Sequence, residues 1–369
     1  MTDARFATPE GTAAYAARRR AEGVSDDVRG FDGLTLSSVG LGTYLGANDT
    51  VTDRFYEAAV GRALELGCNV IDTAINYRCQ RSERAVGRAI AAAIAAGTIR
   101  RDQVLLATKG GYIHYDGEPP PDPAAYFRQT FVLPGLVAPE EVVAGSHSLA
   151  PAFLQHQLDH SLANLNVSCI DLYYLHNPET QLEEVPAERF YRRMRAAFET
   201  LERNVQAGKI RSYGVATWNG LRATAGAGSL VSIEQLLGLA REVAGDGHRF
   251  RVVQLPYSLA MPEAATRKNQ SVKGTLMTPI AAAGALGVYV MGSAALYQSR
   301  LAQSLPSEIR NHLGGLKTDA QRAIQFARST PGVGTALVGM KQVSHVEDNL
   351  ATLTVPPLAP DVPMRLLGA

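Results

Sequence analysis

The chain has 369 residues, of which 46% are hydrophobic and 19% are charged. This composition is typical of a globular protein and excludes a disordered, collagen-like or coiled-coil chain. Lys and Arg number 36 against 35 Asp and Glu, so the net charge of +1 gives no overall attraction to nucleic acid or to an anionic membrane. At about 150 residues per domain, the length fits two domains or one enlarged α/β barrel.

The cysteines and the N-terminus bear on the compartment. Cys68, Cys79 and Cys169 are an odd number without paired spacing, which favours a reducing compartment and offers neither a CxxC motif nor a zinc cluster. Residues 1–20 mix charged residues with alanine and lack the apolar centre of a signal peptide. No run of about 18 apolar residues occurs. We therefore expect a soluble, cytoplasmic protein without a membrane partner.

Short apolar runs alternate with helical patterns along most of the chain. The helical pattern before the second run places Phe55, Ala59 and Ala63 on one face and ends at Gly67. Strands that alternate with helices predict parallel pairing through crossover helices. Eight of the apolar runs are predicted to be buried strands, centred near residues 40, 70, 106, 172, 212, 253, 289 and 336.

Two folds have this alternation, the doubly wound sheet and the closed (β/α)8 barrel. Eight repeats favour the barrel. In addition, Gly40-Leu41-Gly42 lacks the third glycine of the GxGxxG motif that opens a dinucleotide-binding doubly wound fold. We therefore predict an α/β fold, a (β/α)8 TIM barrel over residues 34–353, with an N-terminal extension of residues 1–33 and a C-terminal tail of residues 354–369.

The largest departure from a minimal barrel is a long insertion after the third strand, residues 110–149, rich in proline and aromatic residues. A connection of this length is usually a functional lid or a disordered insert. Its tyrosines and phenylalanines could line the substrate pocket, together with Tyr44 and Trp218, or form a small core of the insertion itself. Both interpretations stay open at this point.

Polar side chains end three otherwise apolar strands. Asp72 ends the second strand, Lys109 the third and His176 the fourth. Because the C-terminal ends of barrel strands meet at one rim, these groups are expected to converge there, and Tyr77 lies close enough in the chain to turn back over the same rim. Alone, Asp72 would be a turn cap and His176 a structural hydrogen-bonding group. The coincidence of all four favours a catalytic site.

The four groups fit one chemistry. A phenol ionises near pH 10, and an adjacent Lys109 ammonium is expected to lower the pKa of Tyr77 and make it a general acid. Asp72 would hold Lys109 by an ion pair, and His176 would orient a substrate carbonyl. This arrangement protonates an oxygen but delivers nothing to carbon, so a hydride carrier is implied.

The motifs around these residues resemble those of the aldo-keto reductase family. Residues 72–77, Asp-Thr-Ala-Ile-Asn-Tyr, are similar to its signature after the second strand. Ala107-Thr108-Lys109 resembles its third-strand lysine motif, and residues 170–176 resemble its fourth-strand motif, which ends in a histidine. The resemblance runs from about residue 34 to residue 352. It implies an NADP(H)-dependent oxidoreductase that interconverts a carbonyl (aldehyde, ketone or sugar) and an alcohol, with the tetrad Tyr77, Lys109, Asp72 and His176.

The resemblance also implies a cofactor site. Gly339 and Lys341 lead into a helix that Ser344 and Glu347 would open with a capping box, and a helix N-terminus beside a lysine favours an anion. Lys341 would bind the adenosine 2′-phosphate. The other implied positions, besides Asp72, are Thr43 near the nicotinamide ribose, Gln254 at the carboxamide, Tyr257 stacked on the nicotinamide, and His345, Asp348 and Asn349 near the adenine.

Two segments depart from the family pattern. After strand five, Ala216-Thr217-Trp218-Asn219 stands where the family usually has Ser-Asn, which hydrogen-bonds the nicotinamide carboxamide. Thr217 or Asn219 could make this contact instead. After strand seven, residues 292–296 lack the usual Ser-Pro-Leu. Cofactor geometry is therefore expected to differ in detail.

Two other functions fit less well. A cofactor-binding regulatory subunit, similar to the potassium-channel β-subunits, would bind cofactor with negligible turnover, and the intact tetrad argues against it. A metal-dependent sugar isomerase needs a cluster of carboxylates and histidines at strand ends, where only Asp72 and His176 qualify, so no metal site is predicted. The expected partner is a small-molecule carbonyl or alcohol; the sequence does not choose among substrates, between NADP and NAD, or among oligomeric states.

Overall fold

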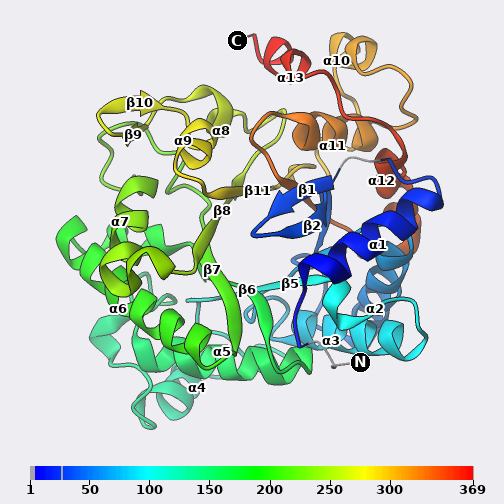
Figure 1. Ribbon diagram of the computed structural model, residues 1–369. Helices are drawn as coiled ribbons and strands as arrows, with labels where there is room; N and C mark the ends of the chain where they lie inside the picture. Colours follow the sequence, from blue (N-terminus) through cyan, green and yellow to red (C-terminus); the bar gives the residue numbers. More distant parts are fainter. Residues whose placement is uncertain (1–4, 26–27, 369) are drawn as a thin grey trace.

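The computed structural model describes residues 5–25 and 28–368. Eight parallel strands close into a barrel in the order β11, β12, β3, β4, β5, β6, β7, β8. Helices surround this barrel (Figure 1), which confirms the predicted (β/α)8 fold. The strands are β3 (Val39–Gly42), β4 (Val70–Asp72), β5 (Leu105–Gly110), β6 (Ile170–His176), β7 (Ile210–Ala216), β8 (Phe250–Pro256), β11 (Tyr289–Ser293) and β12 (Thr335–Gly339).

One helix of the outer layer follows each strand. These helices are α2 (Thr50–Glu65), α3 (Arg81–Ala95), α5 (Pro151–Leu165), α6 (Ala187–Gln206), α7 (Ile233–Ala244), α9 (Pro279–Ala285), α11 (Asp319–Ser329) and α12 (Val343–Leu350). Shorter elements at the periphery are α8 (Glu263–Thr266), β9 (Gln270–Val272), β10 (Thr275–Met277), α10 (Ser307–His312) and α13 (Asp361–Leu366).

Strand β6 shows why the apolar runs become barrel strands. All its residues are buried, since a parallel strand is covered on both faces and needs apolar side chains on each. Leu172 and Tyr174 pack in the barrel interior, whereas Tyr173 and Leu175 pack in the layer beneath the helices. Successive residues of a strand therefore build the two cores, and the last one, His176, stands at the rim.

Helix α2 buries the predicted Ala59 and Ala63 but not Phe55. Phe55 is 43% exposed, whereas Tyr56, Ala59 and Ala63 are buried. The Tyr56 hydroxyl donates to the Leu45 carbonyl oxygen at 2.5 Å. Spacings of three and four residues lie on the same helix face, so Tyr56 and Phe55 are both compatible with the pattern, and packing selects Tyr56.

The N-terminal segment covers one end of the barrel. It contains α1 (Pro9–Ala21) and a hairpin of β1 (Val28–Phe31) and β2 (Leu34–Ser37), which lies across the barrel in Figure 1. Phe31 and Leu34 pack against Val70 and Leu105, which stand at the N-terminal ends of their strands. The opposite, C-terminal end of the barrel carries the polar strand ends.

The insertion after β5 forms a layer of its own beside α5. It contains α4 (Pro123–Phe127), which lies below α5 in Figure 1. Phe131 and Val137 of the insertion form a small core with Ala150 and Phe153. Phe131 therefore belongs to a small core at the insertion and does not line the cavity.

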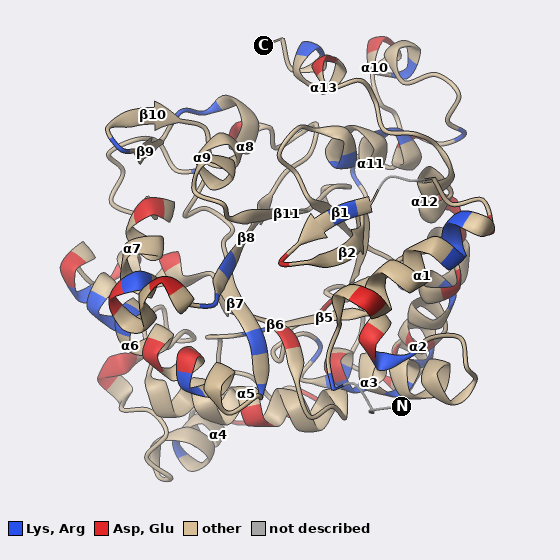
Figure 2. Ribbon diagram, in the orientation of Figure 1, with Lys and Arg blue, Asp and Glu red and all other residues tan. Residues whose placement is uncertain are grey.

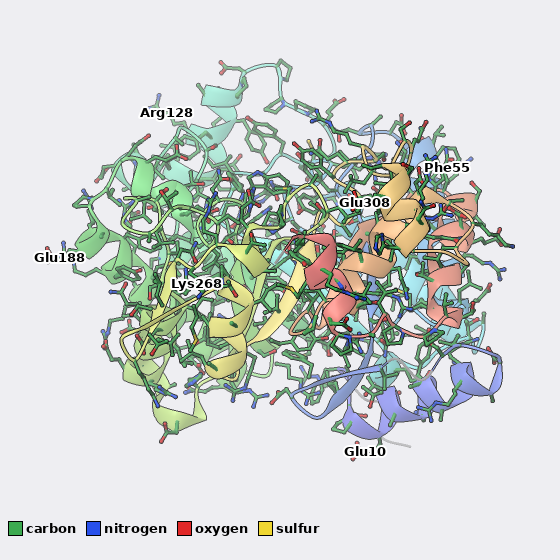
Figure 3. The ribbon with its side chains drawn as sticks, turned by 90° about the horizontal axis from the view of Figure 1, so that it is seen from above. Glu10, Phe55, Arg128, Glu188, Lys268 and Glu308 are labelled. Carbon is green, nitrogen blue, oxygen red and sulfur yellow. The ribbon has the colours of Figure 1, made fainter. Side chains whose placement is uncertain are left out.

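Charged side chains lie mostly on the outer helices, where both signs are interspersed (Figure 2). Arg128 in the insertion and Glu188 at the start of α6 project from the outer edge of the molecule (Figure 3).

Within residues 5–25 and 28–368, no helix combines the length and apolar character required to cross a membrane.

Candidate active site

The four predicted catalytic residues converge at the C-terminal ends of β4, β5 and β6. Lys109 Nζ donates to Asp72 Oδ1 at 2.5 Å and to the Thr73 carbonyl oxygen at 2.8 Å. The Tyr77 ring centroid lies 4.9 Å from Lys109 Nζ and 5.7 Å from the His176 ring. The structure therefore brings a carboxylate, an ammonium, a phenol and an imidazole together.

An unusual turn holds Tyr77 over the rim. The next three residues, Arg78, Cys79 and Gln80, have φ angles of 50°, 54° and 69°, in the left-handed region that non-glycine residues rarely occupy. The buried Arg78 guanidinium fixes this turn by donating to the Ala47 carbonyl oxygen at 2.7 Å and pairing with Asp53 at 2.6 Å. Such strain persists only where surrounding contacts determine the backbone.

The electrostatics of Tyr77 differ from the prediction. Burial raises the pKa of Tyr77 well above its ordinary value, and the negative charge of Asp72 raises it further. Lys109 is fully buried and its ammonium is committed to Asp72 and Thr73, so its charge does not offset the loss of hydration. The predicted lowering of the Tyr77 pKa is therefore wrong for this structure. The phenol keeps its proton at neutral pH.

His176 is a neutral imidazole in this site. Burial lowers the pKa of His176 well below its ordinary value, and the nearby Lys109 and His147 lower it further. Its Nδ1 is buried and has no hydrogen-bond partner among the described residues. Because this nitrogen is buried, a bound ligand would contact the part of the ring that lines the cavity.

A cavity of about 420 Å³ opens at the same rim, a size within the usual range of small-molecule sites. Of the insertion's aromatic residues, Tyr112 reaches this cavity, where Tyr44 and Trp218 stand with it. The predicted residues in its lining are Thr43, Asp72, Tyr77, His176, Thr217, Gln254 and Gly339.

Three of the predicted cofactor residues are tied to the tetrad or to each other. Gln254 Nε2 donates to Asp72 Oδ2 at 2.9 Å. The Thr217 backbone N–H donates to the Gln254 carbonyl oxygen at 2.8 Å. Thr43 Oγ1 donates to Thr73 Oγ1 at 2.9 Å. Hydrogen bonds thus tie Gln254 to Asp72, Thr217 to Gln254, and Thr43 to Thr73, the neighbour of Asp72.

The loop after β7 distinguishes Thr217 from Asn219. Thr217 is buried and lines the cavity, whereas Asn219 is exposed and lies outside its lining. The Glu179 carboxylate fixes this loop by accepting from the backbone N–H groups of Trp218, Asn219 and Gly220 at 2.7, 2.9 and 3.1 Å. Thr217 is thus the residue placed at the cavity.

Tyr257 does not reach the cavity. It is fully buried, its ring stacks on Phe326 with centroids 5.6 Å apart, and its hydroxyl lies 3.0 Å from Thr330 Oγ1. Tyr257 comes after the end of β8, and its backbone N–H is bound to the Ser293 carbonyl oxygen. The side chain therefore packs towards α11, and this position contradicts the predicted stacking on nicotinamide.

The predicted phosphate and adenine residues lie before and along α12, with Lys341 ahead of the helix, His345 in its first turn, and Asp348 and Asn349 near its end. Lys341 is half-buried, His345 is exposed and Asn349 is buried. Asp348 accepts from Thr318 Oγ1 and Gln321 Nε2, both at 2.9 Å. All four residues lie outside the lining of the cavity.

The predicted capping box of this helix is wrong. Helix α12 begins at Val343, with Gln342 at the N-cap and no side-chain cap. Ser344 is the second helical residue, so its hydroxyl does not stand before the first turn, where a capping side chain must stand. The free N–H groups of the first turn remain an anion-favouring end.

Several residues of the lining were not predicted. Gln298 and Ser299 come from the loop after β11, with φ angles of 52° and 70°, and Asn76 and Asn177 flank Tyr77 and His176. The two asparagines adjoin predicted residues, so chain proximity could have indicated them. The irregular backbone at 298 and 299 has no periodic signal in the sequence.

Comparison with known proteins supports the family directly. The model of the Aldo/keto reductase family matches residues 38–365. The NADP(+) aldo-keto reductase yakc of Schizosaccharomyces pombe is 29% identical over 163 residues, which are 43% of this chain and 35% of that protein. The 6-dehydroglucose reductase of Novosphingobium aromaticivorans is 26% identical over 195 residues, which are 51% of this chain and 50% of that protein. The chain thus spans half or less of the length of these curated relatives.

Solved structures share the fold. An aldo/keto reductase from Klebsiella pneumoniae, in complex with NADP and acetate, has a TM-score of 0.61 at 21% identity, over 93% of this chain and 94% of that one. The glycerol dehydrogenase of Gluconobacter oxydans has a TM-score of 0.62 at 20% identity over the same shares. With the family model matched along most of its length, the chain belongs to the aldo/keto reductase family.

Proposed function

We propose that this protein is an enzyme, an NADP(H)-dependent oxidoreductase that interconverts a carbonyl and an alcohol by hydride transfer, with Tyr77 as the general acid and base. The observation that carries the proposal is the convergence of Tyr77, Lys109, Asp72 and His176 beside one cavity of about 420 Å³. The yeast relative is named for NADP(+), and the Klebsiella pneumoniae structure holds NADP.

The residues at the cavity fit a nicotinamide dinucleotide. Gln254 and Thr217 present an amide and a hydroxyl at the cavity, next to the tetrad. Gln298 and Ser299 extend the polar lining along the loop after β11. Beyond Gly339, Lys341 and the uncapped N-terminus of α12 offer positive charge, which suits a phosphate. When bound, NADPH would supply a hydride to the substrate carbon.

The chain itself would supply and accept the proton of the reaction. Because burial keeps Tyr77 protonated, its hydroxyl has a proton to donate to the carbonyl oxygen as that oxygen gains charge. The phenolate left behind would lie next to the Lys109 ammonium, and Asp72 fixes that ammonium in place. In the oxidative direction the same phenolate would accept the alcohol proton.

His176 would orient the carbonyl. As a neutral imidazole that lines the cavity, it can donate a ring N–H to a substrate oxygen without competing for the proton. Tyr44, Tyr112 and Trp218 give the cavity an aromatic wall, which suits aryl aldehydes and the faces of sugars.

We include a cytoplasmic location in the proposal, because Cys68, Cys79 and Cys169 are all free and buried, which suits a reducing compartment.

The test of function is a spectrophotometric titration with NADPH and with NADH across aldehydes, ketones and sugars. Carbonyl-dependent oxidation of NADPH is expected. Cofactor binding without turnover of any substrate would support a regulatory subunit, and the absence of cofactor binding would refute both functions.

A further inference from the structure

A cluster of three histidines lies away from the cavity, between the insertion and helix α5. His156 and His160 are one turn apart on α5, with ring centroids 4.1 Å apart, and His114 comes from the insertion. One ring nitrogen from each of the three lies within 4.8 Å of the other two. The fold has thus brought together two imidazoles of one helix face and a third from a distant segment.

The surroundings hold His114 in place. Its ring packs edge-on against Phe131, 5.3 Å away, in the small core of the insertion. His114 Nδ1 lies 2.9 Å from Gln157 Nε2, so its Nε2 is the ring nitrogen left for another partner. His114 is 2% exposed, His156 is half-buried and His160 is exposed. The cluster is therefore anchored on one side and open to solvent on the other.

One carboxylate near the cluster is already engaged by other side chains. Asp159 is nearby, but its two carboxylate oxygens are engaged by Lys209 at 2.6 Å and Gln155 at 3.1 Å. The cluster thus offers imidazole nitrogens rather than carboxylate oxygens as ligands.

We propose that His114, His156 and His160 bind one transition-metal dication of the Zn²⁺ type and thereby fasten the insertion to α5. Three imidazole ligands suit Zn²⁺, Co²⁺, Ni²⁺ or Cu²⁺, whereas Mg²⁺ and Ca²⁺ prefer oxygen ligands. With three protein ligands, a tetrahedral ion takes its fourth ligand from water, which the exposed side at His160 can supply.

Gln157 connects this site to the cavity. Its Oε1 accepts from the Gly111 N–H at 2.7 Å and its Nε2 donates to the Tyr112 carbonyl oxygen at 2.6 Å, so the amide nitrogen also donates to His114 Nδ1. An imidazole that binds metal through Nε2 carries its proton on Nδ1. Metal binding therefore requires this contact to open.

The test is titration of the full-length, tag-free chain with Co²⁺, followed by visible absorption, and with Zn²⁺ by calorimetry. One equivalent is expected to bind, with the absorption of a four-coordinate Co²⁺ ion, and Mg²⁺ is expected not to compete. His156→Ala and His160→Ala should each weaken binding by more than about tenfold. His312→Ala, at a solvent-exposed histidine on α10, is the matched control and should bind as the unaltered chain does.

A second readout concerns stability and does not depend on enzymatic activity. Zn²⁺ that binds the folded chain should raise its Tm, and this rise should vanish in His160→Ala, whose exposed position leaves folding intact. The proposal is overturned if no saturable single equivalent binds, or if the His156 and His160 variants bind like the control.

Discussion

His147 Nε2 donates to the backbone carbonyl oxygen of His176 across 2.8 Å. Gln181 Nε2 lies 2.9 Å from His147 Nδ1 and donates to it, since the Gln181 carbonyl oxygen accepts from Arg193; the ring proton therefore sits on Nε2. The Tyr112 ring packs edge-on against both imidazoles, with centroids 5.0 and 5.1 Å away. Two residues of the insertion thus fix the backbone and the ring of a predicted catalytic residue.

Loss of this support is expected to impair turnover. In His147→Ala the His176 carbonyl oxygen loses its donor, and we expect kcat to fall about tenfold and the free energy of unfolding to fall by about 1–3 kcal/mol. His147→Gln is the conservative variant, because its amide nitrogen can reach the position of Nε2, and it should recover most of kcat. Steady-state kinetics, with cofactor Kd measured separately, provide the check. An unchanged kcat in His147→Ala would show that the contact has no positioning role.

The same residue predicts a dependence of stability on pH. Burial lowers the pKa of His147 from about 6.5 in the unfolded chain to about 4. As the pH falls through this interval, the unfolded chain takes up a proton before the folded one, so His147 stabilises the fold above pH 6.5 and this contribution is lost towards pH 4. The full effect is about 3 kcal/mol.

Urea unfolding between pH 4 and pH 8 measures this contribution. The difference in unfolding free energy between the unaltered chain and His147→Gln should shrink as the pH falls below about 6.5. A difference that stays constant across the series would contradict a neutral, buried His147.

The Lys109–Asp72 pair predicts a strongly non-additive response to mutation. Lys109 is fully buried and the Asp72 side chain is 6% exposed, so Lys109→Met leaves a carboxylate buried without its counter-charge. Loss of one partner of such a pair costs about 3–5 kcal/mol, whereas removing both charges costs much less. Unfolding of Lys109→Met, Asp72→Asn and the double variant should therefore show a large coupling energy. Additive effects would contradict a direct ion pair.

The proposed contact of Lys341 with the 2′-phosphate predicts a preference for NADPH over NADH. If it binds the adenosine 2′-phosphate, Lys341→Ala loses a charged hydrogen bond of about 1.5–3 kcal/mol with NADPH, and KM for NADPH should rise by about tenfold or more. NADH has no such phosphate, so its KM should be unchanged. Equal effects on the two cofactors would assign Lys341 another role.

The barrel and the rim of the site follow from local sequence signals. Eight apolar runs of strand length and the polar residues at their ends predict the closed barrel and the convergence of Asp72, Lys109 and His176, because strand order and strand ends are linked in this fold. Features that depend on packing could not be predicted from these local signals. The burial of Tyr56 in place of Phe55, and the packing of Tyr257 towards α11, are chosen by neighbours that the local pattern does not specify.

Electrostatics and long-range contacts were also beyond the sequence. The pKa of Tyr77 depends on how completely the fold removes water from the phenol, which motif spacing does not report. His147 meets His176, and His114 meets His156, only because the insertion packs against the barrel and α5. Nothing periodic in residues 110–149 indicates these contacts.

The central claim is that Tyr77 supplies the proton. Tyr77→Phe removes the hydroxyl and keeps the ring, which contacts Tyr44, Lys109 and His176. The direct measurement is kcat for carbonyl reduction together with the Kd for NADPH in this variant. We expect kcat to fall by a factor of about 10² to 10⁴ with the Kd for NADPH unchanged. A variant that keeps kcat within about tenfold of the unaltered enzyme would contradict the assignment of Tyr77 as the general acid.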